Sequence, residues 1–156
     1  MNPKRIPLSQ GKYALVDIED FQELNKWKWH VGNRGYAVRH LKDSNRIKIF
    51  MHRVIIDAPI GKEVDHINQD RLDNRKDNLR VCTRQENLMN QKMSKINTSG
   101  YKGVSYYKKD NRYESRIGFN NKVIYLGRFH TGQDAAIAYN VAAKNYYGEF
   151  ARLNQV

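Results

Sequence analysis

Apolar and polar positions alternate through three segments in the last third of the chain, at 103–109, 112–119 and 122–129. A period of two is typical of a strand with one covered face, so these segments predict a three-stranded antiparallel sheet. Asparagines stand at both expected turns, at 111 and at 120–121. The covered face is expected to carry Val104, Tyr106, Tyr113, Ile117, Phe119, Ile124 and Leu126.

One helix is expected to cover this sheet. Thr131 can cap a helix that runs to about Tyr147 and stops at Gly148. The many alanines between these points allow the helix to lie close on the strands. The other sheet face would then stay open, and its side chains are polar, charged or aromatic: Ser105, Tyr107, Lys109, Arg112, Glu114, Arg116 and Tyr125.

The first 93 residues predict shorter elements. They comprise a strand at 13–16, a helix at 18–25 capped by Asp17, a hairpin of 35–40 with 46–50 across the polar turn 42–45, and a helical turn at 52–56. Two further strands, 63–66 and 79–82, are joined by a long polar loop. Thr83 and Glu86 have the spacing of a capping box, which predicts a helix that continues to about Met93.

The strand–strand–helix unit at 60–93 is too small to bury a core of its own. The single cysteine, Cys82, excludes an internal disulfide and a cysteine-based zinc knuckle, so no structural zinc is expected. Residues 1–59 are therefore predicted to support the unit, although the two tryptophans among them could instead stack on bases. The supporting side chains would be Tyr13, Leu15, Val16, Phe21, Leu24, Trp27, Trp29 and Ile49.

The chain carries a net charge of +12, and this charge is uneven along its length. Residues 1–59 hold 11 basic against 6 acidic side chains, residues 60–93 hold 7 against 6, and residues 94–156 hold 10 against 4. Basic ends around a nearly neutral middle are typical of a protein whose flanks bind phosphate while its central carboxylates bind a cation. A basic surface that only keeps the protein soluble is the alternative.

The nearly neutral middle contains an ordered set of candidate catalytic residues. Asp65 and His66 are adjacent, Asn78 follows twelve residues after the histidine, and Asn87 follows nine residues later. Phosphodiester hydrolysis needs a base for water and a cation for the leaving oxygen. His66 can be the base, Asn78 can fix its tautomer by a hydrogen bond, and Asp65 and Asn87 can be oxygen ligands of the cation. A histidine that only hydrogen-bonds in the core is the alternative for His66.

Residues 50–93 resemble the HNH endonucleases of the phage and homing type. The resemblance lies in Val64-Asp65-His66-Ile67-Asn68, Leu72-Asp73-Asn74-Arg75, Asp77-Asn78-Leu79-Arg80-Val81 and Glu86-Asn87-Leu88-Met89-Asn90. It implies a ββα-metal fold and assigns the base to His66, its orientation to Asn78, and the metal to Asp65 and Asn87. Because asparagine stands at the last motif position, the resemblance implies Mg²⁺ or Mn²⁺. His52 precedes the motif and can contact a phosphate, brace the site or simply begin a helix.

Residues 99–154 resemble the DNA-binding domain of plant Apetala-type and ethylene-response factors. The resemblance lies in Gly100-Tyr101-Lys102-Gly103-Val104, Arg112-Tyr113-Glu114-Ser115-Arg116-Ile117, Tyr125-Leu126-Gly127-Arg128-Phe129 and Ala138-Tyr139-Asn140-Val141-Ala142-Ala143. It implies that the open sheet face enters a major groove, with DNA contacts from Lys102, Ser105, Tyr107, Arg112, Arg116 and Tyr125. Gly118, Val123 and Tyr139 also match contact positions of the family. Ser105, Gly118 and Val123 lack the charge usual there, so the target is expected to differ from the plant site.

These observations predict an α+β protein: an N-terminal α/β support with a ββα-metal unit, then a three-stranded antiparallel sheet packed by one helix. The expected domains are 1–93 for the nuclease, with the support at 1–59 and the motif at 60–93, a linker at 94–99, and 100–156 for DNA binding. We expect a metal-dependent endonuclease of homing type that cuts double-stranded DNA at sites chosen by the C-terminal domain. A regulator that binds DNA without cutting it is the alternative.

The same sequence carries expectations about the protein's surroundings. It contains no apolar run of transmembrane length and no signal-peptide pattern, which predicts a cytoplasmic protein of a bacterium or a phage-infected cell. The expected state is a monomer or a weak homodimer, with DNA as the partner.

Overall fold

The computed structural model describes residues 3–41 and 44–156, and the chain in it forms two compact units, Met1–Asn87 and Leu88–Val156. Helices and small antiparallel sheets occur in both, which confirms the predicted α+β class. Of the expected turn at 42–45, Lys42 and Asp43 lie outside the described residues. In the part of the chain that is described, no helix is both long and apolar enough to cross a membrane.

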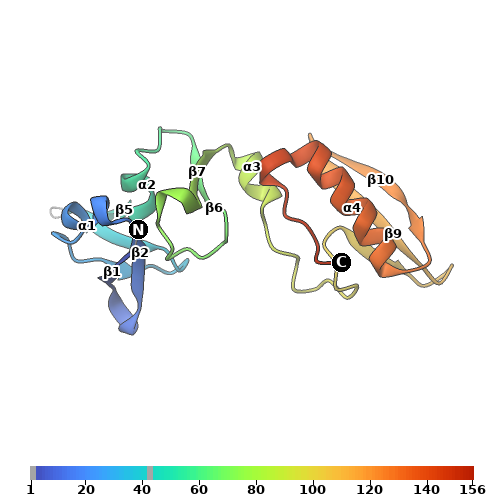
Figure 1. The fold of residues 1–156 in the computed structure, drawn as a ribbon, viewed down its shortest axis with the longest axis horizontal. Coiled ribbons are helices and arrows are strands. Elements are labelled where there is room, and N and C mark those ends of the chain that lie inside the picture. Colours follow the sequence, from blue (N-terminus) through green and yellow to red (C-terminus); the bar gives the residue numbers. More distant parts are fainter. Residues whose placement is uncertain (1–2, 42–43) are drawn as a thin grey trace. The chain divides into compact units, whose positions relative to one another are not determined.

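The first unit contains three small sheets (Figure 1). Strands β1 (Lys4–Pro7) and β2 (Tyr13–Val16) pair antiparallel, and β3 (His30–Val31), β4 (Ala37–Leu41) and β5 (Ser44–Phe50) form the second sheet. The third consists of β6 (Glu63–His66) and β7 (Leu79–Cys82). The helices of this unit are α1 (Ile18–Leu24) and α2 (Met51–Ile55), with short 3₁₀ turns η1 (Ser9–Gly11) and η2 (Lys76–Asn78). Helix α3 (Arg84–Met89) begins in this unit and ends two residues beyond its last residue, Asn87.

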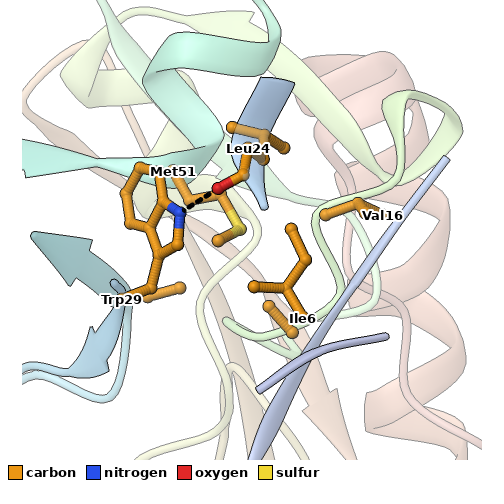
Figure 2. Packing of buried hydrophobic residues seen from close by; sticks show 7 residues of the cluster. Ile6, Val16, Leu24, Trp29 and Met51 are labelled. Atoms are coloured by element: carbon orange, nitrogen blue, oxygen red, sulfur yellow. Dashed lines mark hydrogen bonds between the residues drawn. The ribbon is translucent and has the colours of Figure 1, made fainter. Parts of the chain in front are cut away.

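The support that residues 1–59 were expected to supply is a packed core (Figure 2). Its buried members are Ile6, Ala14, Val16, Leu24, Trp29, Ala37 and Met51. The indole N–H of Trp29 donates to the carbonyl of Leu24 at 2.8 Å, so the largest side chain is buried with its polar atom satisfied. The expectation was wrong for Tyr13 and Trp27, which are both exposed. Tyr13 lies under the Arg5 guanidinium at 4.3 Å, and Trp27 lies under the Arg39 guanidinium at 4.1 Å.

Hydrogen bonds tie this core to the long loop between β6 and β7. The Leu15 amide donates to Leu72 and the Leu15 carbonyl accepts from Asn74, both at 2.8 Å. Asp17 is the N-cap of α1, yet its carboxylate accepts from the Lys76 amide of the loop instead of capping the helix. The loop is therefore held by strand β2 and the start of α1.

The capping box before α3 is confirmed. The Glu86 amide donates to Thr83 Oγ1 at 3.2 Å, and the Thr83 amide donates to the Glu86 carboxylate at 2.7 Å. The helix ends at Met89, four residues before the expected end, and Asn90 that follows is buried. Met93 and Ile96 would continue an apolar face of the helix, but both are exposed, so no burial of apolar surface stabilises further turns.

The second unit contains the predicted sheet and helix (Figure 1). Strands β8 (Val104–Tyr107), β9 (Arg112–Phe119) and β10 (Lys122–Phe129) form an antiparallel sheet in the order β10-β9-β8. Helix α4 (Gly132–Tyr147) packs on it, Thr131 caps the helix by accepting from the Asp134 amide, and Gly148 with φ +53° ends it before η3 (Gly148–Phe150).

Alanines in α4 bring the helix close to the sheet, as the sequence predicts. Ala135 and Ala136 pack on Val104, and Tyr139, Ala142 and Ala143 pack on Ile117. Gly103 stands at the closest approach, with φ +75° and no room for a side chain: a Cβ there would lie 2.1 Å from the Tyr139 ring. The face opposite the helix is open.

Replacement of Gly103 by alanine is expected to destabilise the second unit. Gly103→Ala adds both backbone strain and a collision with Tyr139, whereas Gly100→Ala, at φ +80° with nothing within 4 Å, adds the strain alone. We expect the first variant to lose about 1–3 kcal/mol more unfolding free energy than the second, the usual cost of overpacking. Denaturant titration followed by tyrosine near-ultraviolet circular dichroism measures the difference. Equal losses would contradict the close approach.

Candidate functional site

The β6–β7 hairpin positions the adjacent pair Asp65 and His66. Its register sets Asp65 opposite Arg80 and His66 opposite Leu79. Neighbouring residues of a strand lie on opposite faces, so His66 shares one face with Val64, and Asp65 shares the other with Glu63. The candidate base and the candidate metal ligand therefore belong to two faces of one short strand.

His66 is buried and hydrogen-bonded in the first unit. Its Nε2 lies 3.2 Å from Oδ1 of Asn74, a side chain with no solvent exposure. The Asn74 amide nitrogen donates to the Leu72 carbonyl at 3.2 Å, which identifies the atom near the ring as the oxygen. An amide oxygen only accepts, so Nε2 carries the proton and Nδ1 keeps its lone pair.

The sequence assigned the orientation of this ring to Asn78, and the structure differs. Asn78 Oδ1 accepts from the Asn68 amide at 2.9 Å, and Asn78 Nδ2 donates to the Asp73 carbonyl at 2.7 Å. Asn78 thus braces the loop, and the loop supplies Asn74 to the ring. In the same loop the Arg75 guanidinium, hydrogen-bonded to Asp73, holds the pKa of that carboxyl below its usual value.

Aromatic rings surround the other side of His66. The His52 ring, at the start of α2, stands edge-on to it with centroids 5.2 Å apart. Tyr36 lies 5.0 Å from His52 and 5.8 Å from His66, and Phe50 lies 5.5 Å from His52. Of the roles weighed for His52, bracing the site agrees with this geometry. Tyr36 carried no signal in the sequence, because its place depends on the pairing of β4 with β3 and β5.

Burial keeps both imidazoles neutral at pH 7. Desolvation is the main cause that lowers the pKa of His66 below its ordinary 6.5, against the opposing effect of the Asn74 hydrogen bond and of nearby carboxylates. Desolvation also lowers the pKa of His52 to about 3, with smaller contributions from His66 and Arg53. Among the residues that the structure describes, His52 Nδ1 has no hydrogen-bond partner, as expected for a ring packed among other rings.

A guanidinium lies next to this histidine cluster. Arg71 sits over the Tyr36 ring at 4.8 Å, and its Nη1 donates to the Arg34 carbonyl. The side chain is exposed and held at two points, which leaves further N–H donors for an anion. The sequence did not predict that Arg71 lies beside the histidines, because one arginine in a polar loop forms no recognisable pattern.

The opposite face of β6 carries oxygen ligands. Asp65 is buried, and its Oδ2 accepts from Nε and Nη2 of Arg80 at 2.9 and 2.7 Å. Asn87 Nδ2 donates to the Glu63 carboxylate at 2.6 Å, so the Asn87 amide lies beside the strand face that bears Asp65. Helix α3 thus brings Asn87 to β6, as the sequence predicted.

These residues fit a small, hard cation. Carboxylate and amide oxygens are the ligands that Mg²⁺ prefers, and Mg²⁺ commonly binds one or two carboxylates and completes its shell with water. No three His, Cys, Asp or Glu side chains group as metal ligands in the described ranges, so a site built only from such side chains is not formed there. A cation at Asp65 would share that carboxylate with Arg80.

The open face of the second sheet carries most of the residues expected to contact DNA. Tyr125 is 56% exposed, and Ser105 and Tyr107 are exposed on β8. The Arg116 side chain is exposed, and its Nε lies 2.5 Å from the carboxylate of Glu114. Arg112 stands opposite Tyr107 in the register of β8 and β9. The structure brings these five residues to one face.

Lys102 differs from the other five. Its ammonium donates to the carbonyls of Met89 and Gln91 at 2.6 and 2.9 Å, and burial lowers its pKa to about 8. The side chain thus holds the end of α3 and the segment after it, and two of its three N–H donors are used in doing so. The sequence could not predict this, because these backbone carbonyls come near Lys102 only in the folded unit.

Arg128 is a further residue of this face that the sequence analysis missed. The register of β10 against β9 shifts between Tyr125 and Gly127, and beyond the shift Arg128 pairs with Glu114. A strict period of two from Tyr125 would have set Arg128 on the helix side. Gly127 within a strand was the available signal, since an isolated glycine there often marks a bulge.

Known proteins match both parts of the chain. The model of the HNH endonuclease family matches residues 50–89. A protein of Acanthamoeba polyphaga mimivirus described as an uncharacterized HNH endonuclease is 30% identical over 149 residues, which are 94% of this chain and 77% of the viral protein.

Two other relatives match shorter parts. An AP2-like ethylene-responsive transcription factor of Arabidopsis thaliana is 48% identical over 52 residues, which are 32% of this chain and 15% of the plant protein. Protein 3.8 of Escherichia phage T7 is 38% identical over 64 residues, which are 41% and 53% of the two chains. Because the match to the viral relative covers 94% of this chain and 77% of the viral protein, and because Asp65, His66, Asn78 and Asn87 lie inside the region that the family model matches, the chain belongs to the HNH endonuclease family.

Proposed function

We propose that this protein is a divalent-metal-dependent endonuclease of homing type, which cuts double-stranded DNA at sites selected by the open sheet face of its second unit. The observation that carries the nuclease half of the proposal is the buried, neutral His66, held through Nε2 by Asn74 on a strand whose other face bears Asp65. Neutrality, a fixed tautomer and nearby oxygen ligands are what hydrolysis of a phosphodiester requires.

In this proposal His66 Nδ1 takes a proton from the attacking water. The Asn74 oxygen holds the Nε2 proton and stabilises the imidazolium that forms. His52 and Tyr36 pack against the ring, exclude water from its sides and limit its rotation. Asn78 acts one step away, because it braces the loop that carries Asn74.

Arg71 is the proposed contact for the scissile phosphate. Its guanidinium is oriented by the Tyr36 ring and by the Arg34 carbonyl, and its remaining donors suit two phosphate oxygens. Negative charge accumulates on those oxygens during attack, so a fixed cation next to the base lowers the barrier.

Asp65 and Asn87 are the proposed ligands of Mg²⁺ or Mn²⁺. Such a cation, when bound, stabilises negative charge on the leaving 3′ oxygen. Asp65 supplies the charge and Asn87 a neutral carbonyl oxygen, while the Glu63 carboxylate orients the Asn87 amide.

The second unit is proposed to bind the duplex through its open face. A three-stranded sheet fits the major groove, where arginines recognise base edges and aromatic rings pack on the sugars. Residues 94–156 carry a net charge of +6, which favours binding that weakens as salt rises. The similarity of this part of the chain to a plant transcription factor supports such a role.

Replacement of His66 by alanine is expected to remove cleavage and leave DNA binding. A general base contributes about 10²- to 10⁴-fold to the rate. Nicking of a supercoiled plasmid with Mg²⁺ measures cutting, and duplex binding in chelator measures affinity. The control is His130→Ala, at an exposed position outside the nuclease site. Cutting by His66→Ala at a rate near that of His130→Ala would remove His66 from the mechanism.

As the pH falls, the cleavage rate should decline only below the pH at which a histidine with the ordinary pKa of 6.5 would be half protonated. Burial lowers the pKa of His66 below 6.5, so the neutral base predominates at pH 6.5 and is lost only when the pH falls through the lowered value. Single-turnover rates between pH 5 and 8 check this. An acid limb with its midpoint at or above 6.5 would contradict it.

Substitutions of Asp65 and Asn87 test whether these residues bind the metal, and Asp65 should matter more because it carries a negative charge. Asp65→Asn removes the charged ligand and should raise the Mg²⁺ concentration needed for half-maximal cutting, with Asn87→Ala giving a smaller increase. Asp77→Asn is the matched control, because it removes an exposed loop carboxylate. An Mg²⁺ titration of Asp65→Asn that overlies that of Asp77→Asn would exclude Asp65 as a ligand.

His52 should make the first unit sensitive to acid. Its folded pKa of about 3 lies below the unfolded value of 6.5, so its contribution to stability is complete above pH 6.5 and declines as the pH falls toward 3. From pH 7.5 to 5.0, wild type should lose up to about 2 kcal/mol more unfolding free energy than His52→Gln, at about 1.4 kcal/mol per pH unit. Urea titration followed by tryptophan fluorescence reports this unit alone, since both tryptophans, Trp27 and Trp29, lie in it. Parallel losses in the two proteins would contradict the prediction.

A further inference from the structure

A buried carboxylate stands in the middle of the open sheet face of the second unit. Glu114 lies on β9 with only 5% of its surface exposed, between two arginines. Its Oε1 lies 2.5 Å from Nε of Arg116, and its Oε2 accepts from Nε of Arg128 at 3.2 Å. Each oxygen of the Glu114 carboxylate therefore binds the Nε atom of one of the two arginines.

Arg128 reaches this position through a β-bulge. The shift of register between Tyr125 and Gly127 reverses the faces of β10, and Gly127 adopts φ +132°, which favours glycine. Arg128 then stands directly opposite Glu114. The guanidinium extends across β9 and lies over the Tyr107 ring on β8, with its carbon 4.1 Å from the ring centroid.

Both arginines keep donors after these contacts. A guanidinium has five N–H groups. Arg116 uses its Nε, and Arg128 uses its Nε and also Nη1, which donates to Asp110 in the turn after β8. The two terminal nitrogens of a guanidinium are the fork that binds O6 and N7 of guanine. In Arg116 both of these nitrogens remain available, and in Arg128 Nη2 and the second hydrogen of Nη1 remain.

The charges of this cluster distinguish base recognition from phosphate binding. Arg116, Arg128, Glu114 and Asp110 balance, so the cluster attracts a phosphate backbone weakly. It does hold two forks in place, which reduces the entropy that an arginine loses on binding. Two guanidinium groups that are held in place and whose charge is already balanced are better suited to base edges than to phosphates.

We propose that Glu114 positions Arg116 and Arg128 as a pair of guanine-recognising forks, and that Arg128 is a specificity-determining residue of this protein. The inference rests on the proposed binding of duplex DNA by the open sheet face. Its ligand is a major-groove site with two guanines, one for each arginine.

The test uses the full chain in chelator, so that DNA is bound but not cut. Duplexes selected from a random pool by wild type provide the preferred site. Competition binding then compares that site with versions in which single G·C pairs are replaced by A·T, at several salt concentrations. Lys144→Ala is the charge-matched control, since Lys144 is exposed on α4, the helix on the other side of the sheet.

Arg128→Ala should reduce discrimination at one G·C pair by about 5- to 150-fold, the range for loss of a bidentate contact, and leave the salt dependence nearly unchanged. Arg128→Lys should not restore the preference, because an ammonium lacks the fork. Glu114→Gln should weaken discrimination at two pairs, those affected by Arg116→Ala and by Arg128→Ala. Thermal melting by circular dichroism shows whether each variant folds, and if Glu114→Gln does not, Arg128→Ala and Arg128→Lys decide the outcome.

Two results would overturn the inference. The first is a uniform loss of affinity in Arg128→Ala for all duplexes, with a salt slope smaller by about 0.9, which identifies a phosphate contact. The second is that Arg128→Ala binds all duplexes as Lys144→Ala does, which would show that the Arg128–Glu114 ion pair has no role in recognition. If Arg116→Ala and Tyr125→Ala still weaken binding in either case, the proposed sheet interface stands. If none of these variants changes binding, the interface itself is wrong.

Discussion

The two hydrogen bonds between Leu15 and the β6–β7 loop are the contact on which the proposed nuclease site depends. Leu15 lies on β2, whose neighbours Ala14 and Val16 are fully buried, so its backbone is a rigid edge. It accepts from the amide of Asn74, the residue whose side chain holds His66. A hairpin of two four-residue strands and a six-residue helix has too little apolar surface to fix such a loop alone. The core of Ile6, Trp29 and Met51 supplies that rigidity.

Both units place a buried polar group beside the side chains that are proposed to act on DNA. Asn74, with no exposure, orients the imidazole of His66, and Glu114 orients Arg116 and Arg128. A polar group can be buried at little cost only when it is hydrogen-bonded, and the bond then fixes its partner. In each case the stability of the fold and the geometry of the site depend on the same side chain.

Desolvation has a second effect at the nuclease site. The rings of Tyr36 and His52 pack against His66, and burial lowers its pKa, while the Asn74 oxygen and nearby carboxylates oppose the shift. A base with a pKa below 6.5 is neutral throughout the neutral range, which is the state that accepts a proton. His52 bears the larger shift, because no hydrogen bond compensates for the burial of its ring.

The sequence by itself determined the features that depend on near neighbours. The strands and helix of the second unit, the capping box of Thr83 and Glu86, the cap at Thr131 and the hairpin that bears Asp65 and His66 follow from periodicity and from contacts within a few residues. Only the tertiary structure decided that Asn74 and not Asn78 contacts His66, that Tyr36 joins the site, that Lys102 binds carbonyls and that a bulge brings Arg128 to the open face. Each of these depends on which surfaces pack together. Burial and backbone hydrogen bonds between distant segments set that packing, and a local pattern of residues does not contain them.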